Sequence, residues 1–340
     1  MFYSRLTADN SHLTRLNNGQ RDPNAEAVDG ADKRCAENEV NFTCLPDRVT
    51  TYVEQSLAAN TKRAYLGDLA HFEAWGGTIP ATDTAIASYL AEYAERLSVA
   101  TLCRRLATIS KAHTAKGLIS PTVSELVKST IKGIKRSRGT AQAEAKPLLR
   151  DDLFAVLEQT GSDVKSVRDR ALLLIGFAGG FRRSELVGLN VEDIEHVRQG
   201  IVVLLRRSKT DQESSGRKIA IPFGRTRWCP VAALDQWLSR TAIAAGAIFV
   251  GVNRHGHLSE QRLSAEAVSL VVKERVADAN IDPSRFSGHS LRAGFVTSAA
   301  MAGAKAYKIR AQTGHASDAM LGRYIRDGDL FNCNAAGTIL

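Results

Sequence analysis

Residues 287–294 of this 340-residue chain read SGHSLRAG, and the interpretation of the fold begins with them. His289 and Arg292 stand three positions apart, and side chains at that spacing share one face of a helix. Gly288 and Ser290 indicate that a helix begins here, and the N–H groups of a helix N-terminus favour bound phosphate. The stretch therefore predicts a phosphate site, although a lone His-x-x-Arg pair is common by chance.

A second arginine follows an apolar helix further up the chain. Residues 172–177 are mostly apolar, and residues 180–186 then read GFRRSEL. Arg182 and Glu185 are three positions apart, so they share a face where the helix resumes. Glu185 is thus placed to orient an arginine or a histidine. A simple helix salt bridge would give the same pattern.

Three further groups complete the set. Lys209 lies in residues 208–210 (SKT), just past a β-branched run, where a lysine on a hairpin can protonate a leaving 5′-oxygen. A solvated turn lysine is the alternative. His315 lies in residues 313–315 (TGH), and Tyr324 follows nine residues later. Most tyrosines are core or surface residues, so Tyr324 is a candidate nucleophile only because it follows the other motifs in the chain.

Together these side chains supply what DNA strand cleavage needs. A tyrosine hydroxyl can attack phosphorus and hold the DNA as an aryl phosphodiester, which stays reactive toward a DNA hydroxyl. Two arginine forks can hold the non-bridging oxygens and neutralise the charge that builds on them. We therefore expect no metal ion and no cofactor.

The six residues, in this chain order, resemble the tyrosine site-specific recombinases, also called the phage integrase family, and the closing stretch looks most like the Cre-like members. The resemblance implies that Arg182 and Arg292 clamp the scissile phosphate and that His289 acts as general base or hydrogen-bond partner near the attacking hydroxyl. It implies that His315, where the family has His or Trp, donates to a phosphate oxygen. Tyr324 would be the nucleophile that forms a 3′-phosphotyrosine.

The resemblance also implies the partners and the course of the reaction. Lys209 would protonate the leaving oxygen. The substrate would be a double-stranded DNA recombination site, bound by a homotetramer of two synapsed dimers and passing through a Holliday junction, with accessory DNA-bending proteins as optional partners. Only sixteen residues, 325–340, follow Tyr324. The helix that Cre-like members donate to a neighbour is therefore expected to be short or absent.

Length and hydrophobic periodicity predict two domains. The expected parts are a flexible arm over residues 1–44, an α-helical DNA-binding domain over 45–134, a basic linker over 135–149 and a catalytic domain over 150–340. The expected fold class is mainly α with a small antiparallel β-sheet, the two-domain clamp of the tyrosine recombinases. The sheet is predicted from β-branched runs at 201–205 and 218–221.

Four helices are expected in the smaller domain. The first carries a cap at Thr61, the second opens at Asp83, the third ends at Gly117, and the fourth begins at Thr122.

The charge of the chain favours an acidic partner. The net charge is +9 with a pI near 9.4, and residues 1–44 hold five Lys/Arg against seven Asp/Glu (−2), so residues 45–340 carry +11. Such domains are often nucleic-acid binders, because each phosphate contact releases counterions. Three candidate DNA contacts, Arg104, Arg105 and Lys111, lie away from the apolar stripe of their helix. Four more are basic residues at or just before the linker, namely Lys132, Lys135, Arg136 and Arg138.

Location and redox state follow from simpler features. The five cysteines are scattered without CxxC spacing, which is typical of reduced thiols. No charged-then-apolar leader and no apolar run of about 18 residues is found. We expect a cytoplasmic protein, associated with the nucleoid if it is bacterial.

Three other functions use similar parts. A type IB topoisomerase shares the chemistry, but the helical domain before the catalytic one favours recombination. A catalytically silent DNA-binding regulator is disfavoured by the complete set of six residues. A metal-dependent nuclease is disfavoured because no carboxylate cluster accompanies the motifs.

Overall fold

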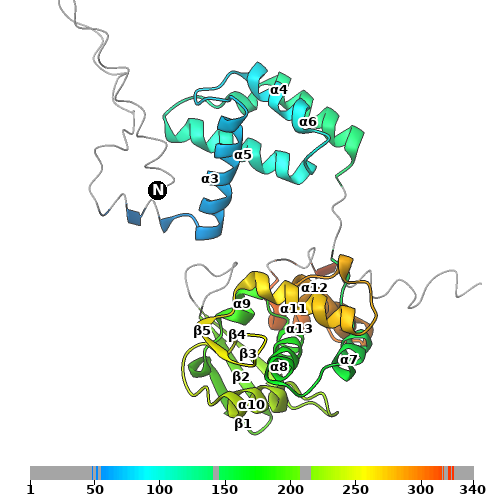
Figure 1. The fold of residues 1–340 in the computed structure, drawn as a ribbon. Coiled ribbons are helices and arrows are strands. Elements are labelled where there is room, and N and C mark those ends of the chain that lie inside the picture. The colour runs from blue at the N-terminus through cyan, green and yellow to red at the C-terminus, as the bar shows by residue number, and fades with distance from the viewer. Residues whose placement is uncertain are drawn as a thin grey trace, which may run out of the picture. The chain divides into compact units, whose positions relative to one another are not determined.

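The computed structural model describes most of two compact units, which divide the chain at residues 143 and 144 (Figure 1). The described residues are 48, 51–52, 55–140, 145–206, 216–315, 317, 321–322 and 324. The predicted arm of residues 1–44, Lys209 and the tail after Tyr324 lie outside them. No helix among the described residues is long and apolar enough to cross a membrane.

The regular structure described in the N-terminal unit is helical. Its elements are α3 (Ala59–Ala74), α4 (Asp83–Tyr93), α5 (Val99–Ala115), the 3₁₀ turn η2 (Pro121–Val123) and α6 (Glu125–Arg138). The hydroxyl groups of Thr82, Ser98 and Ser124 accept backbone N–H bonds at the starts of α4, α5 and α6. Such caps satisfy N–H groups that have no partner inside the helix.

The boundaries of these four helices agree with the sequence only in part, and α3 begins at Ala59, before the predicted cap at Thr61. The second begins at Asp83, as predicted. The third ends at Ala115, and Gly117 follows with φ +71°, as a glycine stop predicts. The fourth starts later than predicted, because Thr122 lies in the 3₁₀ turn and Ser124 is the residue that caps α6.

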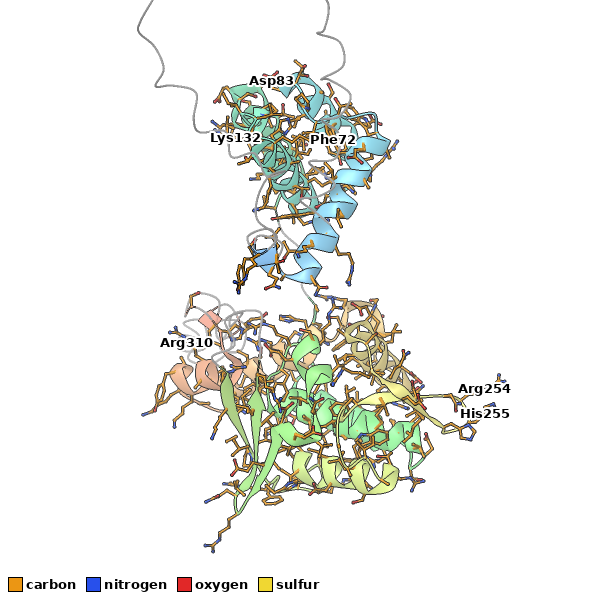
Figure 2. All side chains as sticks on the ribbon, turned by 90° about the vertical axis from the view of Figure 1, so that its left-hand side faces the viewer. Phe72, Asp83, Lys132, Arg254, His255 and Arg310 are labelled. Carbon is orange, nitrogen blue, oxygen red and sulfur yellow. The ribbon has the colours of Figure 1, made fainter. Side chains whose placement is uncertain are left out.

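A core of large apolar side chains holds the N-terminal unit together. Phe72 of α3, marked in Figure 2, is fully buried, and so are Tyr89 of α4 and Val127 of α6. Ile109 of α5 is 1% exposed. Burying a side chain of this size contributes about 1.5–3 kcal/mol. Each of the four helices therefore contributes to the same core.

The predicted basic linker, residues 135–149, is shorter than expected at both ends. Helix α6 continues to Arg138, so the first part of the predicted linker is the last turn of a helix. At the other end, the N–H of Lys146 donates to the Arg285 carbonyl at 2.8 Å and that of Leu148 donates to Ser290 at 3.0 Å. Leu148 is completely buried in the C-terminal unit. Its apolar side chain belongs to that core, which a composition-based boundary could not reveal.

The C-terminal unit is mainly helical with two small antiparallel sheets. Its helices are α7 (Arg150–Glu158), α8 (Val164–Ala178), α9 (Arg183–Gly188), α10 (Pro230–Thr241), α11 (Ala265–Asp278), α12 (His289–Met301) and α13 (Ala306–Thr313), with 3₁₀ turns η3 (Val191–Asp193) and η4 (Pro283–Arg285). One sheet has the order β1 (Ile194–Val197), β2 (Gly200–Leu205), β3 (Arg217–Pro222), and the other pairs β4 (Val250–Val252) with β5 (Leu258–Arg262).

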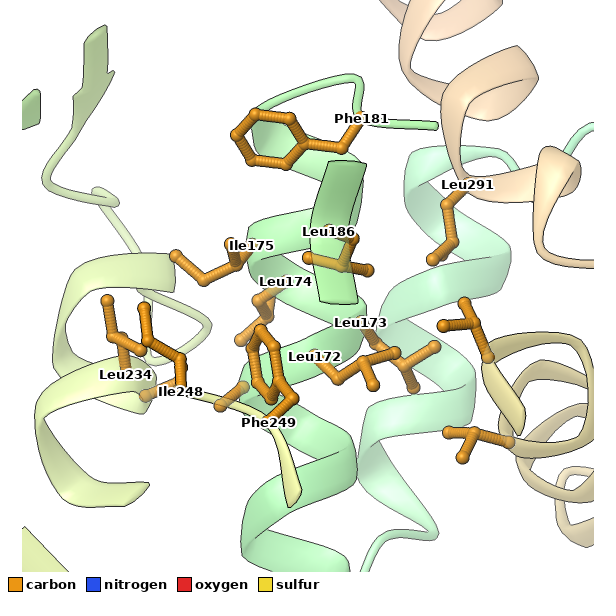
Figure 3. Close-up of a cluster of buried hydrophobic side chains, with 14 of the residues drawn as sticks. Leu172, Leu173, Leu174, Ile175, Phe181, Leu186, Leu234, Ile248, Phe249 and Leu291 are labelled. Atoms are coloured by element: carbon orange, nitrogen blue, oxygen red, sulfur yellow. The ribbon is translucent and has the colours of Figure 1, made fainter. Parts of the chain in front are cut away.

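Helix α8 is the centre of this unit. It packs against α10 and α12, and its residues 171–175 are almost completely buried (Figure 3). Phe181 and Leu186, which follow α8, and Leu291 of α12 join the same cluster. The two segments that carry Arg182 and Arg292 are therefore fixed against one buried helix.

The mainly α fold class with a small antiparallel sheet is confirmed. Two features were not predicted, namely strand β1 and the β4–β5 hairpin, from whose tip Arg254 and His255 project (Figure 2). All five residues of β5 are exposed and most are polar, so the strand has no apolar alternation to detect.

Candidate active site

Arg182 is held at the junction between α8 and α9. The N–H of Arg182 donates to Glu185 Oε2 at 2.9 Å, and Arg182 Nη1 donates to Glu185 Oε1 at 2.6 Å. Both carboxylate oxygens are thus used, one to cap α9 and one to orient the guanidinium. The sequence predicts that Glu185 orients an arginine or a histidine, and the carboxylate does contact Arg182, a contact that a simple helix salt bridge would also make.

Arg292 enters the same place from α12. It is 2% exposed, and its Nη1 donates to the carbonyls of Gly180 and Thr313, at 2.7 Å each. Gly180 has φ +57°, and a Cβ there would lie 2.8 Å from Thr313 Cγ2. Glycine is therefore required where α8 turns toward α9, because it lets the 313–315 segment come close.

One nitrogen of Arg292 has no hydrogen-bond partner in the part of the chain that the structure describes. Its Nη2 is buried and makes no hydrogen bond among the described residues. Burial and the neighbouring charge of Arg182 lower the pKa of Arg292 to about 10. A buried, unpaired guanidinium nitrogen is costly, and an oxyanion would satisfy it.

The histidine and the tyrosine of the predicted set meet directly. Tyr324 Oη lies 2.8 Å from His289 Nε2, and the two ring centroids are 6.3 Å apart. His289 is the first residue of α12, whereas Tyr324 packs beside Leu321 in a small apolar cluster that includes Val296 of α12. The phenol thus lies within proton-transfer distance of an imidazole in the same chain.

His315 also lies beside Tyr324, with ring centroids 6.1 Å apart. Its Nδ1 is 2.7 Å from Thr313 Oγ1, and that hydroxyl is 2.7 Å from the Ile309 carbonyl. A carbonyl can only accept, so the Thr313 proton goes to Ile309 and His315 Nδ1 must be the donor to Thr313. This arrangement leaves Nε2 as the unprotonated nitrogen of the neutral ring.

The electrostatic environment keeps His315 neutral. Burial, and then the positive charges of Arg292 and Arg182, lower its pKa to about 4. Several arginines acting on one buried ring make this region strongly positive. The region is therefore suited to an anion such as a phosphodiester.

A third arginine lies in this site that the sequence did not single out. Arg217 begins β3, and its guanidinium packs over Gly314. It is far from the recognised motifs in sequence, and a basic residue at a strand end is common, so no pattern in the chain identifies it.

Lys209 lies outside the described residues, but the strands on either side of it are placed. β2 ends at Leu205, which pairs with Arg217 at the start of β3. The last residue of β2 and the first residue of β3, Leu205 and Arg217, are therefore neighbours.

The seven candidate DNA contacts divide into two groups. Arg105 was predicted on the outer face of its helix, and this placement is wrong. Its side chain is 10% exposed, lies 3.5 Å from Asp68, and donates to Tyr89 Oη at 2.8 Å. Arg104 donates hydrogen bonds from Nε and Nη2 to the Asp68 carboxylate, each at 2.8 Å, and its side chain is 50% exposed. Burial of Asp68 draws both arginines inward, and the charge pattern alone could not predict this.

The other candidates lie nearer the surface. Lys132, Lys135 and Arg136 are exposed on α6, where Lys132 is marked in Figure 2, and Lys111 is half-buried. Arg138 is also exposed, but its Nη1 donates to the Ala94 carbonyl and to Glu95 at 2.9 and 2.7 Å. Three exposed lysine and arginine side chains on one helix therefore remain as the stronger candidates.

No group of three or more His, Cys, Asp or Glu side chains within the described ranges is placed to hold a metal ion.

Comparison with known proteins assigns this arrangement to a class. Residues 147–329 match the phage integrase family. The integrase/recombinase xerD homolog of Selenomonas ruminantium is 38% identical over 293 residues, which cover 83% of this chain and 86% of the relative. The tyrosine recombinase XerC of Corynebacterium efficiens is 32% identical, covering 76% and 77% of the two chains.

Solved structures give the same fold. A lambda integrase dimer bound to a COC′ core site has a TM-score of 0.59 at 18% identity, covering 83% of this chain and 94% of that one. The XerH site-specific recombinase bound to a palindromic difH substrate has a TM-score of 0.58 at 19% identity, covering 82% and 78%. The chain therefore belongs to the phage integrase family and is a tyrosine recombinase.

Proposed function

We propose that this recombinase cuts and rejoins double-stranded DNA at a specific site, with Tyr324 as the nucleophile. The observation that carries the proposal is the 2.8 Å contact between Tyr324 Oη and His289 Nε2, made beside two arginines that converge on one region. A hydroxyl, a base and two guanidinium groups are the parts that metal-free phosphoryl transfer requires.

The first chemical step follows from these positions. Tyr324 Oη attacks phosphorus while its proton passes to His289 Nε2. The P–O5′ bond breaks, Lys209 protonates the departing 5′-oxygen, and the DNA 3′-phosphate becomes esterified to Tyr324. Attack by a 5′-hydroxyl of the other DNA then reverses these transfers and releases the tyrosine.

Arg182 and Arg292 hold the non-bridging oxygens during this step. Arg292 offers its unpartnered Nη2, and Arg182 remains oriented by Glu185. Charge-assisted bonds of this kind stabilise the charge that grows on the phosphate oxygens as the nucleophile adds.

His315 takes its part only when phosphate is present. In the neutral ring its Nε2 carries no proton, because Nδ1 donates to Thr313. A phosphate bound between Arg182 and Arg292 would offset their charges and raise the pKa of His315. The ring could then take up a proton and donate it from Nε2 to a phosphate oxygen.

The larger assembly belongs to the same proposal. The relatives' names and the DNA in the solved recombinase structures support a duplex DNA partner. We propose that the helical unit contacts this DNA through the exposed basic residues of α6, and that four protomers join two sites through a Holliday junction. Accessory DNA-bending proteins would act on the flanking DNA.

The test is a covalent trap. The target is first found by footprinting the purified protein on the DNA that flanks its gene. The protein is then incubated, with chelator present, on a duplex nicked near the cleavage point, so that the cut strand diffuses away. An adduct that survives denaturing electrophoresis in wild type and disappears in Tyr324→Phe is the expected result.

The outcomes separate the alternatives. Tight binding without an adduct would indicate a silent DNA-binding regulator. An adduct without any Holliday junction between two sites would indicate a topoisomerase. Cleavage that survives in Tyr324→Phe would refute the choice of nucleophile.

A further inference from the structure

Arg217 occupies a position that its strand alone does not explain. It begins β3 and pairs through the backbone with Leu205, yet its side chain reaches the turn after α13. A Cβ at Gly314 would lie 2.7 Å from Arg217 Cζ, so any other side chain there would displace this guanidinium. Gly314 also has φ +66°, so glycine is favoured there for two independent reasons.

The guanidinium of Arg217 makes few contacts with the residues that the structure describes. Its Nη1 is 3.5 Å from the Ala311 carbonyl, which is a long hydrogen bond. Its Nη2 is buried and has no hydrogen-bond partner among the described residues. Arg292 Nη2 is likewise buried without a hydrogen-bond partner among the described residues.

Three arginines therefore approach the same short segment. Arg182 Nη2 lies 3.5 Å from the Gly314 carbonyl, Arg292 Nη1 donates to the Thr313 carbonyl, and Arg217 packs on Gly314. Like charges brought together in a buried place repel each other unless an anion lies between them.

Among the described residues, the negative charge next to the three arginines does not balance them. Burial lowers the pKa of Arg217. Glu185 acts against this shift, and the positive charge of Arg182 adds to it. Glu185 already gives one oxygen to Arg182 Nη1 and the other to the Arg182 N–H. Since unpaired buried charge is costly, the remaining guanidinium groups indicate a bound oxyanion.

We propose that Arg217 is a third guanidinium of the scissile-phosphate site, donating from Nη2 to a non-bridging oxygen beside Arg292. This inference rests on the proposed function and adds a catalytic residue to it. Arg217 also connects the site to the strand that follows the Lys209 segment, because it is the first residue of β3.

The experiment compares charged and neutral phosphates. Arg217→Ala and Arg217→Lys are assayed for the rate of adduct formation on the nicked duplex, once with the natural phosphate and once with a methylphosphonate at the cleavage point. A methylphosphonate replaces one charged oxygen by methyl, which removes the need for a counter-charge. Lys218→Ala is the matched control, since Lys218 is the next residue of β3 and is exposed.

Arg217→Ala should slow adduct formation on the phosphate by about 10²-fold or more, the range found for loss of one oxyanion donor. On one methylphosphonate stereoisomer the difference from wild type should shrink at least tenfold. Arg217→Lys keeps the positive charge but not the paired N–H donors of a guanidinium. Its rate of adduct formation should lie between those of wild type and Arg217→Ala. Lys218→Ala should keep the wild-type ratio between the two substrates.

Two results would overturn the inference. One is an Arg217→Ala rate equal to wild type, and the other is a defect of equal size on phosphate and methylphosphonate, which would mean that Arg217 only braces the Gly314 turn. If Arg217→Ala does not fold, Arg217→Lys and Arg217→Met carry the same comparison. A wild-type protein that forms no adduct would instead contradict the proposed function itself.

Discussion

Tyr324 Oη and His289 Nε2 lie 2.8 Å apart although 35 residues separate them in the chain. His289 is fixed because it begins α12, which packs on the buried helix α8. Tyr324 is placed by the apolar contacts of its own segment with Val296 and Ile309. Both the nucleophile and the base therefore depend on α12, since His289 is its first residue and Tyr324 packs in the cluster that contains Val296.

The first prediction concerns this pair. His289→Ala should slow adduct formation by about 10²–10⁴-fold, the usual contribution of a positioned general base. His289 is exposed, so folding should be unaffected. The rate is measured on the nicked duplex as a function of pH. The variant should gain rate with rising pH, as hydroxide replaces the missing base, and an unchanged rate and pH profile would remove His289 from this role.

The second prediction concerns Glu185. Its side chain is 2% exposed and holds Arg182 by two hydrogen bonds. Removing one partner of a buried ion pair costs about 3–5 kcal/mol, so Glu185→Ala should lower the free energy of unfolding by up to that amount. Glu185→Gln, which keeps the size and can still cap α9, should cost less while slowing cleavage. Urea unfolding and the adduct assay measure the two effects.

Glu195→Gln on strand β1 is the control for this comparison, because Glu195 is exposed. It should change neither stability nor rate. A Glu185→Ala protein with wild-type stability would show that the pair is not held in solution.

The third prediction is a pH effect with a definite sign. The pKa of His315 is about 4 in the folded protein, against 6.5 for an ordinary histidine, mainly because of burial and then because of Arg292. The unfolded chain thus binds the proton more readily. The contribution of His315 to stability is complete above about pH 6.5 and is lost as the pH falls toward 4.

Urea unfolding at about pH 7.5 and pH 5 tests this sign, because the two values lie on either side of the unfolded pKa. The loss of stability between them should be smaller in His315→Gln than in wild type, since glutamine does not titrate. Equal losses in the two proteins would contradict the assignment.

The fourth prediction concerns the acid. Lys209→Ala should reduce cleavage of the natural phosphate by about 10²–10⁴-fold, because the 5′-oxygen then leaves without a proton. A DNA with sulfur at the 5′-bridging position has a leaving group that needs no proton. The variant should therefore regain most of the wild-type rate on it. A persistent defect on the sulfur substrate would assign the acid to another residue.

Most of the candidate site could be predicted because its residues stand in short motifs. His289 and Arg292 lie on one turn of a helix. Arg182 immediately precedes the helix that carries Glu185, so local spacing places each pair. The sequence also suggested that Tyr324 belongs with them, through the order of the residues along the chain.

Arg217 could not be predicted in this way. Its role depends on β3 lying beside the turn at Gly314, which is a contact between distant parts of the chain. The burial of Arg105 could not be predicted for a related reason. A charged residue off the apolar stripe is expected in water, and only the buried carboxylate of Asp68 reverses that preference.

The fifth prediction follows from that buried carboxylate. Asp68 is 3% exposed and binds Arg104 and Arg105 in the N-terminal unit. Asp68→Ala would leave Arg105 buried without its counter-charge, at a cost of about 3–5 kcal/mol. Because the two units need not unfold together, a single melting temperature is a poor measure. Amide hydrogen exchange of peptides from residues 59–138 reports on the helical unit alone.

The matched control is Glu95→Ala, which removes the ion pair with Arg138. Glu95 is 80% exposed, and surface pairs of this kind contribute about 0–1 kcal/mol. Exchange from residues 59–138 should therefore be much faster in Asp68→Ala and nearly unchanged in Glu95→Ala. If both variants exchanged like wild type, Asp68 would not be an interior anchor, and Arg104 and Arg105 would again be free to contact DNA as the charge pattern predicts.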